Sequence, residues 1–501
     1  MKKVLFLIGL MMMTAAASAQ VDDGWDSTLM GGWIDQSDFD QFRQQAEQQY
    51  DSFRDSANAR FARALAGKWQ PFAVSKPLDN PYKPAPKTPP VAPKREHPRQ
   101  PVPQKLPGLT VPLPEPTTPP QPRKMDPPAL PVEVSQARVP FYNAMLTVDV
   151  PSGSRLSHCH LADMSEASVS RFWQQLVRAD MQGSIGQLIE QQRQYRLNDW
   201  GLYDMTSRLA QSLFPNDENS QVALTVFLLN QMEYNVRIAR TDKGLGCLMA
   251  IKGDIYAVPF ITIGDIRYYI FMPHNGQHSL EGNVNTYTVT FESATRDVNV
   301  ELHEFPQLPR RNASSAYNHT VAGNRVHVVA NESLMDFYSN YPQVECSVYA
   351  TAAVGGDFAA AIERNFRPLV TGKGNYEAVA ALLNFMHYGF DYATDQEQFG
   401  YEKPFFCEEN FYYPKNDCED RSILFSYLVR SLLGLDVVLL EYSDHVATAV
   451  LFPQGNAIGD YYLINGKQFV VCDPTYIGAS IGMAMPEYRS PDTEVKVILL
   501  Q

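Results

Sequence analysis

The sequence predicts an α+β protein, because it contains both helical and strand-like patterns and its strand-like segments follow one another closely. A helical segment at residues 418–433 ends before Gly434, a residue typical of the position after a helix. Four strand-like segments follow, and Asn465-Gly466 between the last two indicates a tight antiparallel hairpin. We therefore expect this helix to pack on an antiparallel sheet.

Length and charge limit the classes of function. A chain of 501 residues corresponds to about three domains. Hydrophobic residues make up 45% of it, which is ordinary for a globular protein. The formal net charge of −13 argues against nucleic acid or an anionic membrane as a partner, since either needs a basic surface.

Residues 1–19 have the pattern of a signal peptide. Lys2 and Lys3 precede an apolar stretch at residues 4–13, and Ala17 and Ala19 form an A-x-A cleavage pattern. The apolar stretch is about half as long as a membrane-spanning helix. No cysteine directly follows the cleavage position, and no later stretch is long and apolar enough to span a membrane. We predict a periplasmic or secreted bacterial protein.

Residues 20–76 contain one predicted amphipathic helix. Apolar residues recur in steps of three or four from Phe39 to Leu65, which places them on one face of a helix at residues 38–65. Two interpretations remain open. The face packs on the body of the same protein, or it docks on a partner or a second copy.

Residues 77–137 are predicted to be a proline-rich linker. Of 36 prolines in the chain, 20 lie between Pro77 and Pro131, and the stretch has no hydrophobic periodicity. Such a composition favours a semi-rigid polyproline II conformation.

Two domains are predicted to follow, at residues 138–330 and 331–501. In the first, the pattern predicts a strand at 139–150, helices at 165–179, 185–195, 200–213 and 221–232, and strands at 234–240, 248–252, 255–261 and 266–272. In the second, it predicts helices at 375–388 and 418–433 and strands at 437–441, 446–452, 461–464 and 468–472.

Three residues of the last domain suit nucleophilic catalysis. Cys418 stands at the predicted start of a helix, where unpaired N–H groups and the helix dipole favour a thiolate. His445, at the start of a strand, is suited to take the thiol proton, and Asp473, at the end of another strand, is suited to orient the imidazole. The neighbouring carboxylates oppose the thiolate, although they also stabilise the first turn of the helix.

This arrangement resembles the transglutaminase-like superfamily, whose papain-like fold carries a helix-borne cysteine, a strand-borne histidine and an Asp-Pro-Thr strand end in that order. The resemblance covers residues 375–485 and implies that Cys418 is the nucleophile, His445 the general base and acid, and Asp473 the orienting residue. It also implies an oxyanion hole made by the Cys418 backbone N–H and an upstream side chain. The candidates for that side chain are Tyr392, Gln398 and Tyr401. The sequence departs from many members at Val446-Ala447, where they carry Ala-Trp.

A narrower resemblance concerns Asp391-Tyr392-x2-Asp395-x3-Phe399-Gly400 followed by Asp417-Cys418-Glu419-Asp420. It is similar to the bacterial periplasmic cysteine proteases that control adhesin release, in which acidic residues beside the nucleophile bind calcium. The resemblance implies a calcium site made by Asp417, Glu419 and Asp420, although no cofactor is required by the triad itself. Stabilisation of the helix start is the alternative role of these residues.

The earlier domain repeats part of the later one at a spacing of about 200 residues. Each domain has an Asn-Asp pair, then a helix, then a strand. The pair is Asn216-Asp217 in the first domain and Asn416-Asp417 in the second, and the strands lie at residues 234–238 and 435–439. No histidine lies between Gln221 and Pro273, so the first domain is predicted to be either an inactive copy or an unrelated helix–strand segment.

The leading functional prediction is an exported thiol hydrolase that cleaves a peptide or amide bond of a protein or peptide substrate. Acyl transfer to an amine is the first alternative, since it uses the same triad. A non-catalytic scaffold or binding protein of the cell envelope is the second. Pairing of Cys407 with Cys418 would make the enzyme latent.

Overall fold

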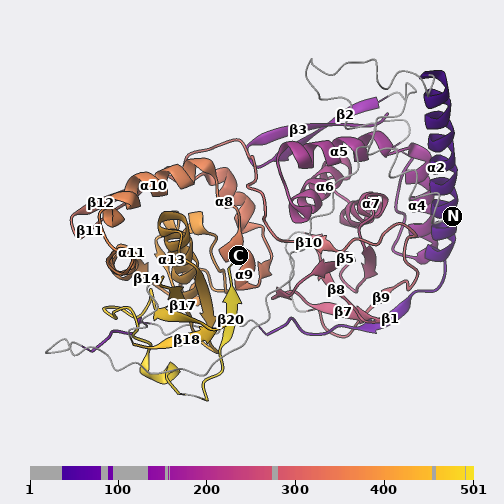
Figure 1. The fold of residues 1–501 in the computed structure, drawn as a ribbon. Helices are drawn as coiled ribbons and strands as arrows, with labels where there is room; N and C mark the ends of the chain where they lie inside the picture. The colour runs from indigo at the N-terminus through magenta and orange to yellow at the C-terminus, as the bar shows by residue number, and fades with distance from the viewer. Residues whose placement is uncertain are drawn as a thin grey trace.

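Two mainly antiparallel sheets, each with a long helix packed on one face, occupy the two halves of the molecule in this computed structural model (Figure 1). The structure describes residues 36–79, 88–93, 134–152, 156, 158–273, 280–453, 459–490 and 492–500. The predicted signal peptide and most of the predicted linker lie outside the described residues. We call residues 134–310, with the strand at Gln70–Ala73 that joins their sheet, the first unit, and residues 317–500 the second unit.

The first unit packs its helices on a sheet with the order β1-β9-β4-β5-β8-β7, to which β10 adds a short parallel pairing with β5. Its helices are α4 (Glu166–Ala179), α5 (Gln182–Gln194), α6 (Asp199–Leu213) and α7 (Glu218–Gln231). The strands of this sheet are β1 (Gln70–Ala73), β4 (Val236–Arg240), β5 (Leu245–Lys252), β7 (Phe260–Ile263), β8 (Ile266–Phe271), β9 (Asn283–Thr286) and β10 (Val298–Asn299). A separate hairpin pairs β2 (Val134–Phe141) with β3 (Ala144–Pro151).

The second unit packs helix α13 (Cys418–Leu433) on a sheet with the order β18-β19-β17-β16-β20. These strands are β16 (Val437–Glu441), β17 (Val446–Leu451), β18 (Tyr461–Ile464), β19 (Lys467–Cys472) and β20 (Lys496–Leu499). The other helices are α8 (Glu332–Ser339), α9 (Cys346–Thr351), α10 (Gly356–Val370), α11 (Asn375–Gly389) and α12 (Asp395–Gln398), with 3₁₀ turns η2 (Cys407–Phe411) and η3 (Pro486–Tyr488). Short pairs join β11 (Tyr317–Val321) to β12 (Asn324–Val328) and β14 (Asp391–Tyr392) to β15 (Lys415–Asn416).

The two sheets share one topology. In each unit a helix leads into a two-stranded hairpin, β4–β5 in the first unit and β16–β17 in the second. Two further strands and a later edge strand complete the sheet. The resulting strand order is β9-β4-β5-β8-β7 in the first unit and β20-β16-β17-β19-β18 in the second. The registers of β4, β5, β7 and β8 agree with those of β16, β17, β18 and β19 at a constant offset of 201 residues. Val236 pairs with Met249 as Val437 pairs with Val450, and Cys247 pairs with Phe271 as Thr448 pairs with Cys472. The predicted internal repeat therefore has a structural counterpart that extends well beyond the helix and first strand from which it was predicted.

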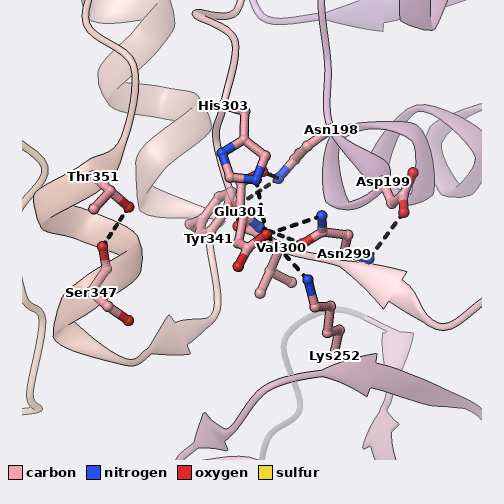
Figure 2. A network of polar contacts seen from close by, with 10 residues as sticks. All are labelled: Asn198, Asp199, Lys252, Asn299, Val300, Glu301, His303, Tyr341, Ser347 and Thr351. Atoms are coloured by element: carbon pink, nitrogen blue, oxygen red, sulfur yellow. Dashed lines mark hydrogen bonds and ion pairs between the residues drawn. The ribbon is translucent and has the colours of Figure 1, made fainter. Parts of the chain in front are cut away.

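A pairing of β6 (Ile255–Tyr256) with β13 (Gln343–Val344) joins the two units. Beside it, a polar network connects the start of α6 to residues 299–303 of the first unit and to Tyr341 of the second (Figure 2). Asn198 donates to the hydroxyl of Tyr341 at 2.6 Å, and Glu301 accepts from the His303 ring at 2.9 Å and pairs with Lys252 at 3.6 Å. The units are therefore joined by backbone and polar side-chain contacts.

Helix α2 (Gln36–Leu65) confirms the predicted amphipathic helix, and its C-terminal half packs on the first unit (Figure 1). Phe61 is buried against Trp173 and Phe291, with ring centroids 4.8 and 5.3 Å away, whereas Tyr50 and Phe53 are exposed. Packing on the body thus accounts for the second half of the apolar face. Within the described residues, no helix is long and apolar enough to cross a membrane.

The described parts of the predicted linker form backbone bridges with both units. Leu78 forms a bridge with Tyr256 in the first unit, and Val91 forms a parallel bridge with Ile477 in the second. The Ala92 N–H donates to the carbonyl of Ile477, and the Ile477 N–H donates to the carbonyl of Pro90, both at 2.8 Å. A proline lacks an N–H but keeps its carbonyl acceptor, so a proline-rich segment can still pair when the neighbouring residue supplies the donor. We call residues 88–93 the strap.

Two predicted boundaries were wrong. Residues 139–150 form a hairpin rather than one strand, because Tyr142 and Asn143 adopt positive φ values of 39° and 64° and reverse the chain. Residues 317–328 pack on α10 and α11, and the Tyr317 hydroxyl donates to the carbonyl of Gly389 at 2.5 Å. This hairpin therefore belongs with the second unit rather than with residues 138–330.

Candidate active site

The start of α13 is fixed by carboxylates that bind backbone N–H groups. Asp420 accepts from the N–H of Asp417 at 3.3 Å and from the N–H of Phe405 at 2.8 Å. Acceptors at this position satisfy donors that have no partner within the helix. Cys418 is consequently the first residue of the helix, as predicted, and Ser422 ties the next turn to β17 by donating to the carbonyl of Val446 at 2.8 Å.

His445 and Asp473 meet at the ends of adjacent strands. Thr448 of β17 pairs with Cys472 of β19, which brings the residue before β17 close to the residue after β19. His445 Nε2 lies 2.9 Å from Asp473 Oδ2, and both side chains are buried. When Nε2 carries the proton for this bond, Nδ1 is the basic nitrogen of the neutral ring.

Asp473 is held as a carboxylate. Its Oδ1 accepts from the N–H groups of Thr475 at 2.9 Å and Tyr476 at 3.1 Å. Burial by itself would raise the pKa of Asp473, but His445 and these two N–H groups outweigh it and lower the pKa below its usual value. A carboxylate whose ionised form is favoured in this way suits the role of orienting and stabilising an imidazolium.

The thiol of Cys418 faces Glu419 in this conformation. Its Sγ donates to Glu419 Oε2 at 3.1 Å, and the backbone N–H of Val446, the residue after His445, also points at the sulfur. Burial raises the pKa of this thiol well above its usual value, and Glu419 and Asp417 raise it further. The predicted lowering by the helix dipole is therefore outweighed here, and the thiol is protonated.

Two aromatic residues that stack on each other lie beside the imidazole. The Tyr488 ring lies parallel to that of His445 with centroids 5.5 Å apart, and the Tyr442 ring is nearly parallel to it at 6.3 Å. The Tyr488 hydroxyl donates to Asp444 at 2.9 Å. Neither tyrosine was predicted as part of the site, because nothing in the sequence pattern connects η3 to the turn before β17.

Of the three oxyanion candidates, only Tyr392 lies beside the thiol. The pairing of β14 with β15 sets Tyr392 opposite Asn416, two residues before Cys418. Its hydroxyl is buried without a partner among the described residues, and burial followed by the nearby Cys418 and carboxylates raises its pKa. Gln398 instead donates to the carbonyl of Lys415 at 3.1 Å, and Tyr401 is exposed beside Phe399.

A buried acidic cluster lies next to the thiol. Carboxylate oxygens of Asp395, Asp417 and Glu419 all lie within 4.8 Å of one another. Asp417 Oδ1 and Glu419 Oε1 have no hydrogen-bond partner in the described part of the chain. Burial raises the pKa of Asp395 to about 7 and raises those of Asp417 and Glu419 well above their usual values, and repulsion by neighbouring carboxylates adds to the effect.

This cluster differs from the predicted ligand set in one member. Asp420 binds backbone N–H groups, whereas Asp395, from α12, takes the third place. Two of the three carboxylates, Asp417 and Glu419, have an oxygen without a hydrogen-bond partner among the described residues. Bound protons or a cation would compensate them, and oxygen donors of this kind suit calcium. Asp395 was missed because its approach depends on the β14–β15 pairing rather than on sequence distance.

All six cysteines lie among the described residues, and each is buried. Cys407 lies in η2 and forms no disulfide with Cys418, so the latent, oxidised form is not the conformation seen here. Comparison with known proteins finds no matching family model, no similar curated protein and no similar solved structure, so membership of the transglutaminase-like superfamily stays a prediction.

Proposed function

We propose that the chain is an exported thiol hydrolase that cleaves a peptide or amide bond with Cys418, His445 and Asp473. The observation that carries this proposal is the buried His445–Asp473 pair, with its Nε2–Oδ2 distance of 2.9 Å, beside the first residue of α13. A histidine oriented by a carboxylate next to a helix-borne thiol has the parts that acyl chemistry requires.

In the proposed reaction the thiol turns from Glu419 toward His445 Nδ1, which takes its proton. The sulfur attacks the carbonyl carbon, and the oxyanion receives hydrogen bonds from the Cys418 N–H and the Tyr392 hydroxyl. His445 returns the proton to the departing amine as the C–N bond breaks and a thioester forms. Water then cleaves the thioester, with His445 acting as the base, and the acid product leaves.

Comparison with the first unit supports a functional rather than a structural role for Cys418, His445 and Asp473. At the matching positions it carries Glu218 after the N-cap Asp217, Gly244 before β5 and Met272 after β8. The same helix and sheet therefore form without a cysteine, a histidine or an aspartate at these positions. Folding alone does not account for their presence in the second unit.

The acidic cluster is proposed to bind calcium through Asp395, Asp417 and Glu419. Its unpaired buried oxygens and raised pKa values support this, because a buried anionic cluster is costly without a compensating charge. A cation there would oppose the effect of Asp417 and Glu419 on the thiol and so favour the reactive thiolate. The signal-peptide pattern at residues 1–19 supports a proposed location in the periplasm or outside the cell.

The test is alkylation of the mature protein with iodoacetamide from pH 5 to 9, with calcium or with EDTA, read by peptide mass spectrometry. We expect Cys418 to react faster than the buried controls Cys407 and Cys472, and to slow by about tenfold or more in His445→Ala and Asp473→Asn. The proposal fails if Cys418 reacts no faster than these controls and is indifferent to His445.

A primary amine added to the same preparation separates hydrolysis from acyl transfer. Incubation with a peptide mixture should yield new carboxyl termini from a hydrolase. Amine adducts at the acyl position would instead identify a transferase with the same triad.

A further inference from the structure

His387, a buried residue of α11, uses both ring nitrogens to hold one loop of the candidate site. Its Nε2 lies 3.0 Å from the backbone carbonyl oxygen of Asp473, and its Nδ1 lies 3.3 Å from the backbone nitrogen of Gly478. Only 6% of the residue is exposed. The ring therefore bridges the two ends of the loop at residues 473–478 from a helix 86 residues away in the sequence.

These contacts define the tautomer of His387. A carbonyl can only accept and an N–H can only donate, so Nε2 carries the proton and Nδ1 carries the lone pair. The ring is neutral in this arrangement, because protonated Nδ1 would meet the Gly478 N–H donor to donor. In this tautomer a single rigid ring offers the donor that the carbonyl needs and the acceptor that the N–H needs.

The loop that His387 holds is folded around the carboxylate of Asp473. Asp473 Oδ1 accepts from Thr475 and Tyr476 of the loop, while Oδ2 is left to bind His445. The position of the Asp473 backbone therefore sets the position of Oδ2 relative to the imidazole of His445. His387 contacts that backbone and does not touch His445 or Cys418 through any hydrogen bond of the described chain.

We propose that His387 is a positioning residue for the triad, which fixes the loop at residues 473–478 so that Asp473 orients His445. This inference rests on the function proposed for the Cys418 site, to which it adds a residue that acts through another. It also gives a role to the only histidine of α11. The sequence pattern predicted the helix that carries this residue but no role for it.

The charged groups that face His387 are Asp473 in the loop and Arg421 of α13. Burial lowers the pKa of His387, and Arg421 acts in the same direction, whereas the Asp473 contacts oppose it. The neutral form is thus kept at neutral pH, which is the form that the two hydrogen bonds need.

Two isosteric variants separate positioning from packing. In His387→Gln the amide nitrogen can replace Nε2 and still donate to the Asp473 carbonyl. In His387→Asn the shorter amide reaches only the position of Nδ1, so the hydrogen bond to the Asp473 carbonyl is lost. His303→Gln is the matched control, because this histidine is 63% exposed and lies outside the site.

The first readout is the NMR signal of the His445 Nε2 proton in histidine-labelled full-length protein, assigned by its loss in His445→Ala. The second is the rate of Cys418 alkylation across pH, and the third is the thermal unfolding midpoint. We expect wild type, His387→Gln and His303→Gln to keep the His445 signal. His387→Asn should lose or shift it and slow alkylation on the order of 10-fold to 100-fold.

An unchanged His445 signal and an unchanged rate in His387→Asn overturn the proposal. Equal losses in the Gln and Asn variants, in step with their unfolding midpoints, overturn it as well, since they indicate a packing role. If wild-type Cys418 proves unreactive, the proposed function fails, yet the His445 signal still decides whether His387 positions Asp473.

Discussion

At the scale of single residues, the thiol of Cys418 donates to a carboxylate rather than to an imidazole. Glu419 is both its hydrogen-bond acceptor and, after burial, the main cause of its raised pKa. A nucleophile in such surroundings needs the negative charge beside it to be neutralised before it can ionise. Control of reactivity therefore lies with the neighbours of the cysteine as much as with its base.

Replacing Glu419 by Gln tests this dependence. In EDTA at pH 7, Cys418 of the variant should be alkylated faster than in wild type. The rate should rise by about tenfold for each unit by which the pKa of the thiol falls. Calcium should speed the wild type and leave the variant unchanged, because the variant lacks a ligand. The pH profile of alkylation measures both effects.

Glu397→Gln is the control for that experiment, since its carboxylate lies on α12 but is exposed. It should match wild type with and without calcium. Slower alkylation of Glu419→Gln in EDTA would contradict the role given to this carboxylate.

The residues of the site were only partly predictable. Cys418, His445 and Asp473 follow recognisable local patterns at the ends of a helix and of strands, and the structure brings His445 and Asp473 together. Asp395 belongs to the motif quoted for the narrower resemblance but was not among the predicted ligands, and His387 was not predicted as part of the site. Each reaches it through tertiary packing, across 22 residues to Asp417 and 86 residues to Asp473, and no local pattern encodes such contacts.

At the scale of elements, the prediction worked where short-range chemistry decides the structure. Asn465 and Gly466 adopt φ values of 51° and 76° in the hairpin that their sequence indicated. It did not work at Tyr142-Asn143, where a bulky residue takes a positive φ of 39° within a tertiary context. Helix α10 was not predicted, and it continues through Pro368, a residue that normally argues against a helix interior.

The strap, residues 88–93, is an ordered segment that the proline-rich composition did not predict. Its Ala92 is 8% exposed and joins the apolar cluster on the outer face of the second sheet, together with Tyr442, Tyr476 and Tyr488. Val91, its neighbour, is 70% exposed. The pairing with Ile477 therefore turns one side of the strap inward and the other toward solvent.

This difference gives a matched pair of variants. Ala92→Asp should destabilise the protein by about 2 kcal/mol or more, because it places a charge in an apolar cluster. Val91→Asp should change the free energy of unfolding by less than about 0.5 kcal/mol. Urea unfolding measures the difference, and limited proteolysis within residues 88–93 shows whether the strap has been released. Equal effects of the two variants would mean that the strap does not pack as described.

At the scale of the whole molecule, buried acids make stability depend on pH. Burial raises the pKa values of Asp395 and Glu408 to about 7, while their unfolded values lie near 4. The folded state therefore binds more protons than the unfolded state between about pH 4 and pH 7. The stability contributed by these groups is full below that window and is lost as the pH rises through about 7.

We accordingly expect the protein in EDTA to be less stable at pH 8 than at pH 5.5, by on the order of 2 kcal/mol. Calcium should reduce this slope, since a cation compensates the charges that protons otherwise remove. Thermal unfolding across the range measures the effect, and Asp395→Asn should flatten the slope in EDTA. Stability that is constant or increases from pH 5.5 to pH 8 in EDTA would show that the cluster is not protonated as inferred.

The repeated topology has a practical consequence for finding the unknown substrate. The first unit shows that this helix and sheet assemble without a nucleophile, with Glu218 at the position of Cys418. A Cys418→Ala chain should therefore keep its shape and its binding surfaces while it loses the ability to form a thioester. Such an inert chain, displayed on beads, is the natural bait with which to retain uncleaved substrate from the cell envelope.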